Sequence, residues 1–278
     1  MTQRTTPAGK RSMTGGGAFS SVLWALTLVG LALLTLPTAS LVWRAYEARD
    51  SINNPHARDV LNDALTLSVT TTLLALALIV IFGTPVAYVL ARAKFRGARL
   101  VDVLIDLPII LPPSVAGIAL LAAFGRRGIF GTWLNDWGIT IGFTTTAVVI
   151  AQIFVAAPFY IRTARAGFLR VDRSLEEAAA DLGATPMRTF FRVTLPLCRG
   201  SLLAGAILAW ARALGEFGAT IMFAGNLQGV TQTLPLAIYE RFGAGDLNSA
   251  LVLSVVLLAT SLVFLIVVRI LGEESSPR

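Results

Sequence analysis

Residues 64–91 read ALTLSVTTTLLALALIVIFGTPVAYVLA, a run of 28 residues without a charged side chain. A helix rises about 1.5 Å per residue, so about 20 apolar residues are enough to cross the roughly 30 Å hydrocarbon layer of a bilayer. The run exceeds that length. It therefore predicts a membrane-spanning helix, with a kink at Pro85.

Five further apolar segments lie on either side of this run, and together the six occupy half of the 278 residues. The expected spans are 19–43, 64–91, 101–124, 143–161, 201–224 and 250–268. The first apolar run is longer than a signal-peptide core of roughly 7–15 residues, so we expect it to be retained as a helix. The sequence thus predicts an all-α membrane protein with one transmembrane domain at 19–271 and tails at 1–18 and 272–278.

The composition excludes an ordinary soluble domain. Hydrophobic residues make up 55% of the chain and charged residues only 14%, whereas soluble proteins are about 25% charged. The formal net charge is +7, which in a soluble chain would suggest a nucleic-acid partner. Here the apolar majority favours a lipid bilayer as the partner, and we expect no nucleic acid.

The basic residues are distributed unequally between the two sides of the predicted spans. Segments 1–18, 92–100, 162–200 and 269–278 hold 16 Lys and Arg residues, and the alternate segments hold 6. Because basic residues accumulate on the cytoplasmic side, both termini and the long loop 162–200 between the fourth and fifth spans are predicted to be cytoplasmic.

Within that loop, residues 174–196 read SLEEAAADLGATPMRTFFRVTLP, which predicts two short helices. Ser174 followed by Glu177 is typical of a capping box, in which each side chain bonds the other residue's backbone amide. Gly183 is expected to end the first helix in the left-handed conformation.

The second short helix is expected to begin at Thr185, with Pro186 in its first turn, and Pro196 is expected to close it. Its expected apolar face consists of Met187, Phe190 and Phe191. Such a capped pair of helices fits either an amphipathic anchor on lipid headgroups or a docking element for a cytoplasmic protein. The residues alone favour neither.

The same stretch resembles the EAA motif of ABC importer permeases, with valine where isoleucine is common. The matching residues are Glu177, Ala178, Ala179, Gly183, Val193, Leu195 and Pro196. In that family the loop forms coupling helices that sit in a groove of the ATP-binding subunit. The resemblance implies the same role for this loop, and a location in a prokaryotic cytoplasmic (inner) membrane.

Other stretches are similar to permeases of molybdate and tungstate importers. They are LPIILPPSVAG at 107–117, RALGEFGAT at 212–220, AGN at 224–226 and TQTLPL at 231–236. Sulfate and thiosulfate permeases have a related stretch and are the alternative. The resemblance implies transport of a tetrahedral oxyanion, with selectivity residing largely in a separate binding protein.

The chain carries no G-x-x-x-x-G-K-[ST] phosphate loop, so ATP with Mg would have to be used by another polypeptide. The resemblance implies two permease copies, two ATP-binding subunits and an extracytoplasmic substrate-binding protein, with no cofactor in this chain. An ion-coupled carrier is the competing class. His56 and Cys198 have no partners at catalytic spacing, so we expect no enzyme, and we expect Asp102 and Asp106 to bond neighbouring helices.

Arg212, Glu216 and Thr220 stand four residues apart and would share one stripe of a continuous fifth span. Charges at membrane depth face protein or water rather than lipid. Arg212 could attract a passing oxyanion and Thr220 could donate a hydrogen bond, while Glu216 restrains Arg212. The alternative is an Arg212–Glu216 pair that only fixes helix packing.

Two further sets of residues are candidates for the translocation pathway. Prolines in the third span leave carbonyls without helical partners, which is tolerated where the backbone is buried or lines a cavity. Beyond the fifth span, polar residues form a glycine-flanked loop. The candidates are Pro112, Pro113, Ser114 and Asn226.

Overall fold

The structure is a computed structural model that describes residues 17–273, so the predicted tails lie largely outside the described residues. In this part of the chain every regular element is a helix, as predicted. Five helices are long and apolar enough to cross a membrane, and the number rises to six if one bent pair counts as a span.

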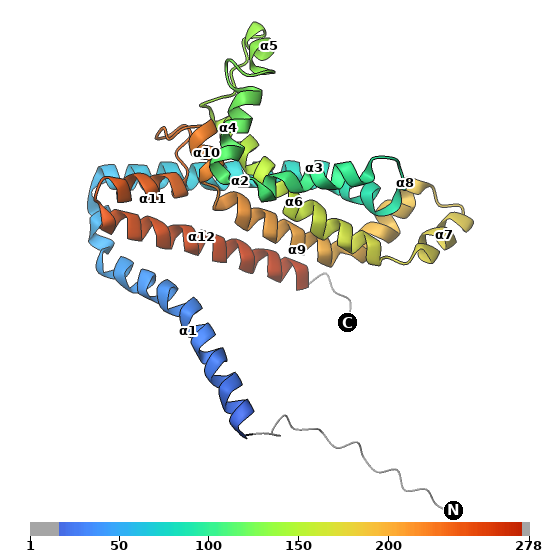
Figure 1. The fold of residues 1–278 in the computed structure, drawn as a ribbon, viewed down its shortest axis with the longest axis horizontal. Helices are drawn as coiled ribbons and strands as arrows, with labels where there is room; N and C mark the ends of the chain where they lie inside the picture. Colours follow the sequence, from blue (N-terminus) through green and yellow to red (C-terminus); the bar gives the residue numbers. More distant parts are fainter. Residues whose placement is uncertain (1–16, 274–278) are drawn as a thin grey trace, which may run out of the picture.

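Three helices form the centre of the bundle: α2 (Pro55–Arg92), α6 (Thr145–Arg170) and α9 (Leu195–Leu214). They lie side by side along the long axis in Figure 1. Their contact faces are apolar and mostly small, which allows close approach of helix backbones. The buried residues of this contact include Ile79, Ala87, Ala156, Tyr160, Phe168, Cys198, Ala209 and Ala213.

These central helices extend beyond the predicted spans. The 38 residues of α2 correspond to about 57 Å of helix, well beyond the roughly 30 Å hydrocarbon layer. Likewise α6 continues to Arg170, and α9 is preceded without interruption by α8 (Pro186–Thr189) and the π-helix η2 (Phe190–Thr194). Much of the predicted 162–200 loop is therefore helical extension of its two neighbouring spans.

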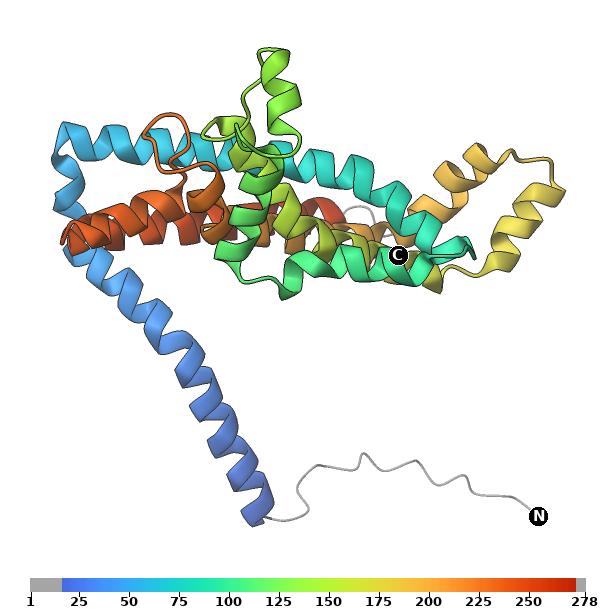
Figure 2. The ribbon, with the colours of Figure 1, turned by 45° about the horizontal axis from the view of Figure 1, so that its top comes forward.

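The third predicted span, 101–124, is not one straight helix. It consists of α3 (Ala98–Ile110) and α4 (Pro113–Phe124), whose axes differ by 117°. Leu111 is extended, as residues before proline tend to be, and Pro113 occupies the first turn of α4. As a result, α4 and the short α5 (Gly131–Asp136) project from one side of the bundle (Figures 1 and 2).

The fifth predicted span, 201–224, is also interrupted, and the expectation of a continuous helix was wrong. α9 ends at Leu214, and a separate helix α10 (Gly218–Phe223) follows. α10 packs tightly on α4. A methyl group added to Gly218 would lie 2.3 Å from Cβ of Pro113, so only glycine allows this approach.

The remaining helices lie at the periphery. α11 (Leu234–Gly243) and α12 (Leu247–Glu273) pack on each other and on α2, while α1 (Gly17–Glu47) leaves the bundle in both ribbon views (Figures 1 and 2). The short 3-10 helix η1 (Arg49–Asn53) connects α1 to α2. From residue 20 onward most apolar side chains of α1 are exposed, as expected of a helix that meets lipid or another membrane chain.

The contact between α6 and α9 depends on a glycine, and its replacement is a direct test of the fold. A methyl group at Gly167 would lie 2.4 Å from Cβ of Ser201. We expect Gly167→Ala to lower the free energy of unfolding in detergent by about 1–3 kcal/mol, the usual cost of overpacking.

Gly200, the residue before Ser201 in α9, supplies the matched control. A methyl group there meets nothing within 4 Å, and alanine is favoured over glycine in helices by about 0.5–1 kcal/mol. Gly200→Ala should therefore leave the free energy of unfolding in detergent unchanged or raise it. Equal stability of Gly167→Ala and the unmodified protein would contradict the packing described.

Candidate functional site

The helical loop between α6 and α8 lies at one end of the bundle (Figure 1). Its first helix, α7 (Arg173–Asp181), begins two residues earlier than a cap at Ser174 would give. Asp172 is the N-cap, and its carboxylate accepts a hydrogen bond of 3.0 Å from the amide of Ser174. The predicted capping box of Ser174 and Glu177 is therefore wrong, because a better acceptor stands two residues before Ser174.

The end of α7 and the start of α8 agree with the prediction. Gly183 has a φ of +84°, and its amide bonds the Ala180 carbonyl at 2.8 Å while the Ala184 amide bonds Ala179 at 2.9 Å. This pair of bonds is a Schellman motif. Thr185 then caps α8 through the Arg188 amide at 3.3 Å.

Pro196 does not close the second helix. The helix continues from α8 through a π turn, in which the Leu195 amide reaches the Phe190 carbonyl, into α9. Pro196 lacks an amide hydrogen and would clash with the carbonyl four residues earlier in a regular α-helix. The wider π turn just before it accommodates the proline without ending the helix.

The residues of the EAA-like motif have unequal exposure. Glu177, Ala178, Gly183 and Pro196 are exposed, whereas Ala179, Val193 and Leu195 are half-buried. The expected apolar face of α8 is divided, because Phe190 packs against Tyr88 at 4.9 Å and Phe168 at 6.2 Å.

The apolar tip of the loop consists of Leu182 and Met187, whose exposed fractions are 90% and 70%. The exposed position of Leu182 was not predicted from the sequence. The residue directly before the glycine that ends a helix lies at a turn, and an apolar side chain there is a signal that could have identified it.

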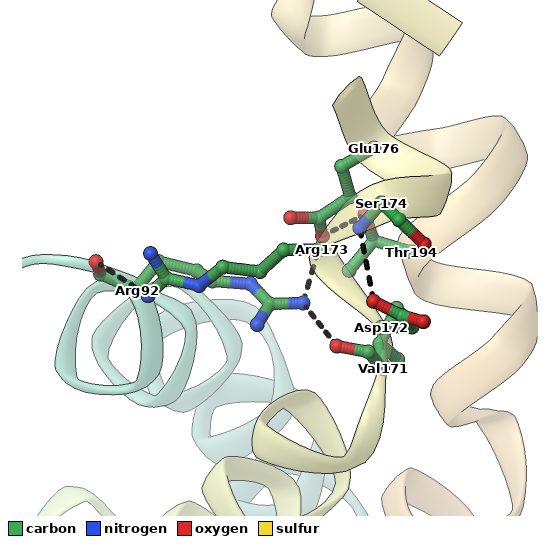
Figure 3. A network of polar contacts seen from close by, with 7 residues as sticks. All are labelled: Arg92, Val171, Asp172, Arg173, Ser174, Glu176 and Thr194. Atoms are coloured by element: carbon green, nitrogen blue, oxygen red, sulfur yellow. Dashed lines mark hydrogen bonds and ion pairs between the residues drawn. The ribbon is translucent and has the colours of Figure 1, made fainter. Parts of the chain in front are cut away.

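A partly buried polar network joins this loop to α2 (Figure 3). Nη2 of Arg92 donates to Oε1 of Glu176 at 3.0 Å and to the Val171 carbonyl at 3.1 Å. The Thr194 hydroxyl donates to the same Glu176 oxygen at 2.7 Å. This network was not predicted from the sequence, because nothing local distinguishes Glu176 from Glu177 as the glutamate that faces inward.

The second candidate location is the break between α9 and α10. Nη1 of Arg212 lies 2.6 Å from Oε2 of Glu216, and the other Glu216 oxygen accepts from the Ala219 amide at 2.8 Å. Only 1% of the Glu216 side chain is exposed, against 31% for Arg212. Glu216 therefore both pairs with Arg212 and caps α10, and the predicted continuous stripe with Thr220, which is buried in α10, does not form.

Arg212 also lines a small cavity of about 120 Å³ at the bend between α3 and α4. It is the one charged residue among the lining side chains described. The others are Pro108, Ile109, Leu111, Pro113, Ala116, Val155 and Phe159. The structure thus brings Arg212 and Pro113 together at the meeting point of the two helix breaks.

The other pathway candidates lie elsewhere. Pro112 and Ser114 are exposed and do not line this cavity. Asn226 follows α10, and its Nδ2 donates to Glu240 of α11 at 2.8 Å, which ties the loop to that helix.

The acidic residues of α3 bond a neighbouring helix, as predicted. Asp102 pairs with Arg165 and Asp106 pairs with Arg162, both from α6. These are structural ion pairs rather than a catalytic carboxylate pair. Within residues 17–273 there is no group of three or more His, Cys, Asp or Glu residues placed to hold a metal ion.

Apolar spans with interrupted helices, an ion pair at one of the breaks and a capped helical loop at one end are features expected of a membrane transport protein. Residues 83–274 match the family of the binding-protein-dependent transport system inner membrane component. The chain belongs to this family of ABC importer permeases, which are multi-pass inner-membrane proteins.

The chain is 48% identical over 201 residues to the molybdenum transport system permease protein ModB of Mycobacterium bovis, covering 72% of this chain and 76% of that one. It is 35% identical over 269 residues to the probable sulfate transport system permease protein cysT of Nephroselmis olivacea, covering 96% and 95%. The fold is similar to that in a crystal structure of a bacterial ABC transporter that imports alginate, with a TM-score of 0.74, 14% identity and coverage of 94% and 96%. These findings establish that the chain is a transporter permease subunit, as predicted, and argue against the competing class of ion-coupled carriers.

The N-cap of α7 can be tested by hydrogen exchange. In Asp172→Ala we expect the first-turn amides of α7, Ser174 included, to exchange about fivefold faster at neutral pH, because their acceptor is lost. Ser174→Ala, which would be the damaging change if the capping box formed, keeps the amide bond to Asp172 and loses only the hydroxyl contact, so it should have a clearly smaller effect. The reverse result would restore the capping box.

The pH dependence of this cap follows from the same hydrogen bond. The Ser174 amide lowers the pKa of the Asp172 carboxyl from its ordinary value. A group with a lowered folded-state pKa stabilises the fold above its unfolded pKa and loses that effect as the pH falls through the folded value. We expect hydrogen-exchange protection of α7 in the unmodified protein to be constant down to about pH 4, the ordinary Asp range, and to decline below it.

Proposed function

We propose that this chain is the transmembrane subunit of an ATP-driven importer for a tetrahedral oxyanion, molybdate or tungstate. The observation that carries the proposal is the higher identity to a molybdenum permease, 48%, than to a sulfate permease, 35%. Of the stretches similar to molybdate and tungstate permeases, 107–117 contains the break between α3 and α4, and 212–220 contains Arg212 and the break between α9 and α10. The alternative is sulfate or thiosulfate, because the match to the sulfate permease extends over 96% of this chain.

In this proposal the working importer contains two copies of this chain, two ATP-binding subunits and an extracytoplasmic binding protein. ATP and Mg are bound by the ATP-binding subunits. The unequal distribution of basic residues supports a cytoplasmic location of the α7–α8 loop and of both termini.

The α7–α8 loop is proposed to dock the ATP-binding subunit. Both short helices have capped ends, which fix the loop's shape before it meets a partner. Leu182 and Met187 form an exposed apolar tip at the end of the bundle, where a protein groove can enclose them. Lipid anchoring is less well supported, because Phe190, the first residue of η2, packs against Tyr88 and Phe168 of the bundle.

Arg212 is proposed to provide the positive charge that an oxyanion meets on its passage. Its guanidinium is partly exposed and lines the cavity at the two helix breaks. Glu216 neutralises part of that charge, which suits a pathway, because conduction requires binding weak enough to allow release.

The importer is tested by co-purification with candidate ATP-binding subunits, followed by reconstitution in liposomes with the binding protein. We expect ATP-dependent uptake of molybdate that excess tungstate abolishes and excess sulfate does not. Competition by sulfate at equal concentration would favour the alternative substrate. Failure of every ATPase to bind a chain with an intact 174–196 loop would overturn the permease assembly proposed.

Replacement of Arg212 separates its role in transport from its role in packing. We expect Arg212→Ala to reduce oxyanion uptake about tenfold or more, because the positive potential at the cavity is lost, and to leave ATPase co-purification intact. Arg212→Lys keeps a cation near Glu216 and should retain part of the uptake. Normal uptake by Arg212→Ala would remove Arg212 from the mechanism and leave only its pairing with Glu216.

A further inference from the structure

We infer that the Arg92–Glu176–Thr194 network is a positioning device that holds α7 at a fixed angle to the bundle and thereby couples ATP hydrolysis to transport. The inference rests on the proposed function, because it assumes that the α7–α8 loop docks an ATPase. It concerns residues outside the EAA-like match: Arg92 and Glu176 precede that match, and Thr194 occupies one of its variable positions.

α7 has little else to hold it in place. None of its residues is buried, so it gains almost nothing from apolar packing against the bundle. Glu176 is the residue of α7 that turns inward, and only 17% of its side chain is exposed. The orientation of α7 therefore depends mainly on this carboxylate, with a longer hydrogen bond from Arg173 to the Arg92 carbonyl and the two short connections that flank the helix.

The Glu176 carboxylate connects three separate parts of the chain. Arg92 is the last residue of α2, and Thr194, which is fully buried, is the last residue of the π turn that leads into α9. Both donate to Oε1 of Glu176, from opposite sides in sequence (Figure 3). A displacement of α7 must therefore move α2 and α9 with it or break charge-assisted hydrogen bonds in a partly dry site.

The network is reinforced on both sides. Arg92 also bonds the Val171 carbonyl directly before α7, and Arg173 donates to the Arg92 carbonyl at 3.3 Å. Next to the network, Tyr88 packs edge-on against Phe168 at 5.4 Å and against Phe190 at 4.9 Å. The polar and aromatic contacts together join the end of α2 to the π turn, so the base of the loop is rigid while its tip is free to bind.

A docking surface and a positioning device have different consequences when they are damaged. Loss of an exposed docking residue such as Glu177 weakens binding of the ATPase. Loss of the inward-facing Glu176 leaves the exposed surface present but lets α7 pivot, so that ATP-driven movement of the partner is absorbed by the loop. The specific prediction is a fall in oxyanion transported per ATP hydrolysed, without loss of the complex.

The test uses the full chain with its ATPase and binding protein in liposomes. Glu176→Gln removes the charge that Arg92 pairs with, and Thr194→Val removes one donor at nearly constant volume, which keeps the test valid if the first variant folds poorly. Asp181→Asn is the matched control, because Asp181 is an exposed carboxylate at the other end of α7 and is not part of the network. Three quantities are measured: ATPase co-purification, oxyanion uptake per ATP hydrolysed, and the distance between spin labels at Lys94→Cys and Ala180→Cys in a Cys198→Ser background.

We expect Glu176→Gln to bind the ATPase as the unmodified chain does, to transport about fivefold less oxyanion per ATP, and to broaden the distribution of label distances. Thr194→Val should show the same changes to a smaller extent, and Asp181→Asn none. Arg92 and Glu176 act as one unit. The double variant Arg92→Gln, Glu176→Gln should therefore lose no more oxyanion transport per ATP than the more damaging of the two single variants.

An unchanged ratio of uptake to ATP hydrolysis in Glu176→Gln, with the complex intact, would overturn this inference and leave the proposed function standing. An unchanged distribution of label distances would overturn it too, and this third quantity is also measured on the full chain before its partners are added. If the unmodified chain binds no ATPase, the proposed function fails and the coupling role of the network fails with it.

Discussion

A chain inside a bilayer must satisfy its own backbone hydrogen bonds, and this constraint explains where the helices of this permease are allowed to break. At the break after Leu214, the Glu216 carboxylate accepts a hydrogen bond from the Ala219 amide and pairs with Arg212. The break before Pro113 lies against α10, where Gly218 permits the closest contact. Glu216 at the second break is buried, whereas Pro112 and Pro113 at the first are exposed but carry no amide hydrogen that needs a partner. The proximity of the two breaks creates the cavity that Arg212 lines.

The sequence predicts which segments form the helical bundle better than it predicts where those helices bend. Apolar runs locate the spans, because burial in hydrocarbon depends on side chains that can be read one at a time. The direction of a helix is a different property. Segments 101–124 and 201–224 are mostly apolar, and apolarity does not distinguish a straight crossing from a bend of 117°. Prolines at 112 and 113 mark the first break, whereas the second needs the contact between α10 and α4, which lies far away in sequence.

Local rules succeed where only one residue fits and fail where two neighbours compete. Gly183 and Thr185 have no rivals, and the structure shows both in the predicted capping roles. Ser174 and Asp172 both suit an N-cap, and Glu176 and Glu177 both suit a first turn. In each pair the structure selects the residue that the sequence analysis passed over. For Glu176 the reason is a partner 84 positions away in α2, which no local pattern reveals.

The uninterrupted helix from Pro186 to Leu214 has a mechanical consequence. Its 29 residues form a rod of about 43 Å, with the Thr194 network near one end and Arg212 at the other. Side chains project radially from such a rod, so a twist about its own axis displaces the Arg212 guanidinium sideways past Pro113 while the rod itself stays in place. A torque applied at the α8 end could therefore change the charge that faces the cavity without opening the bundle or separating its central helices.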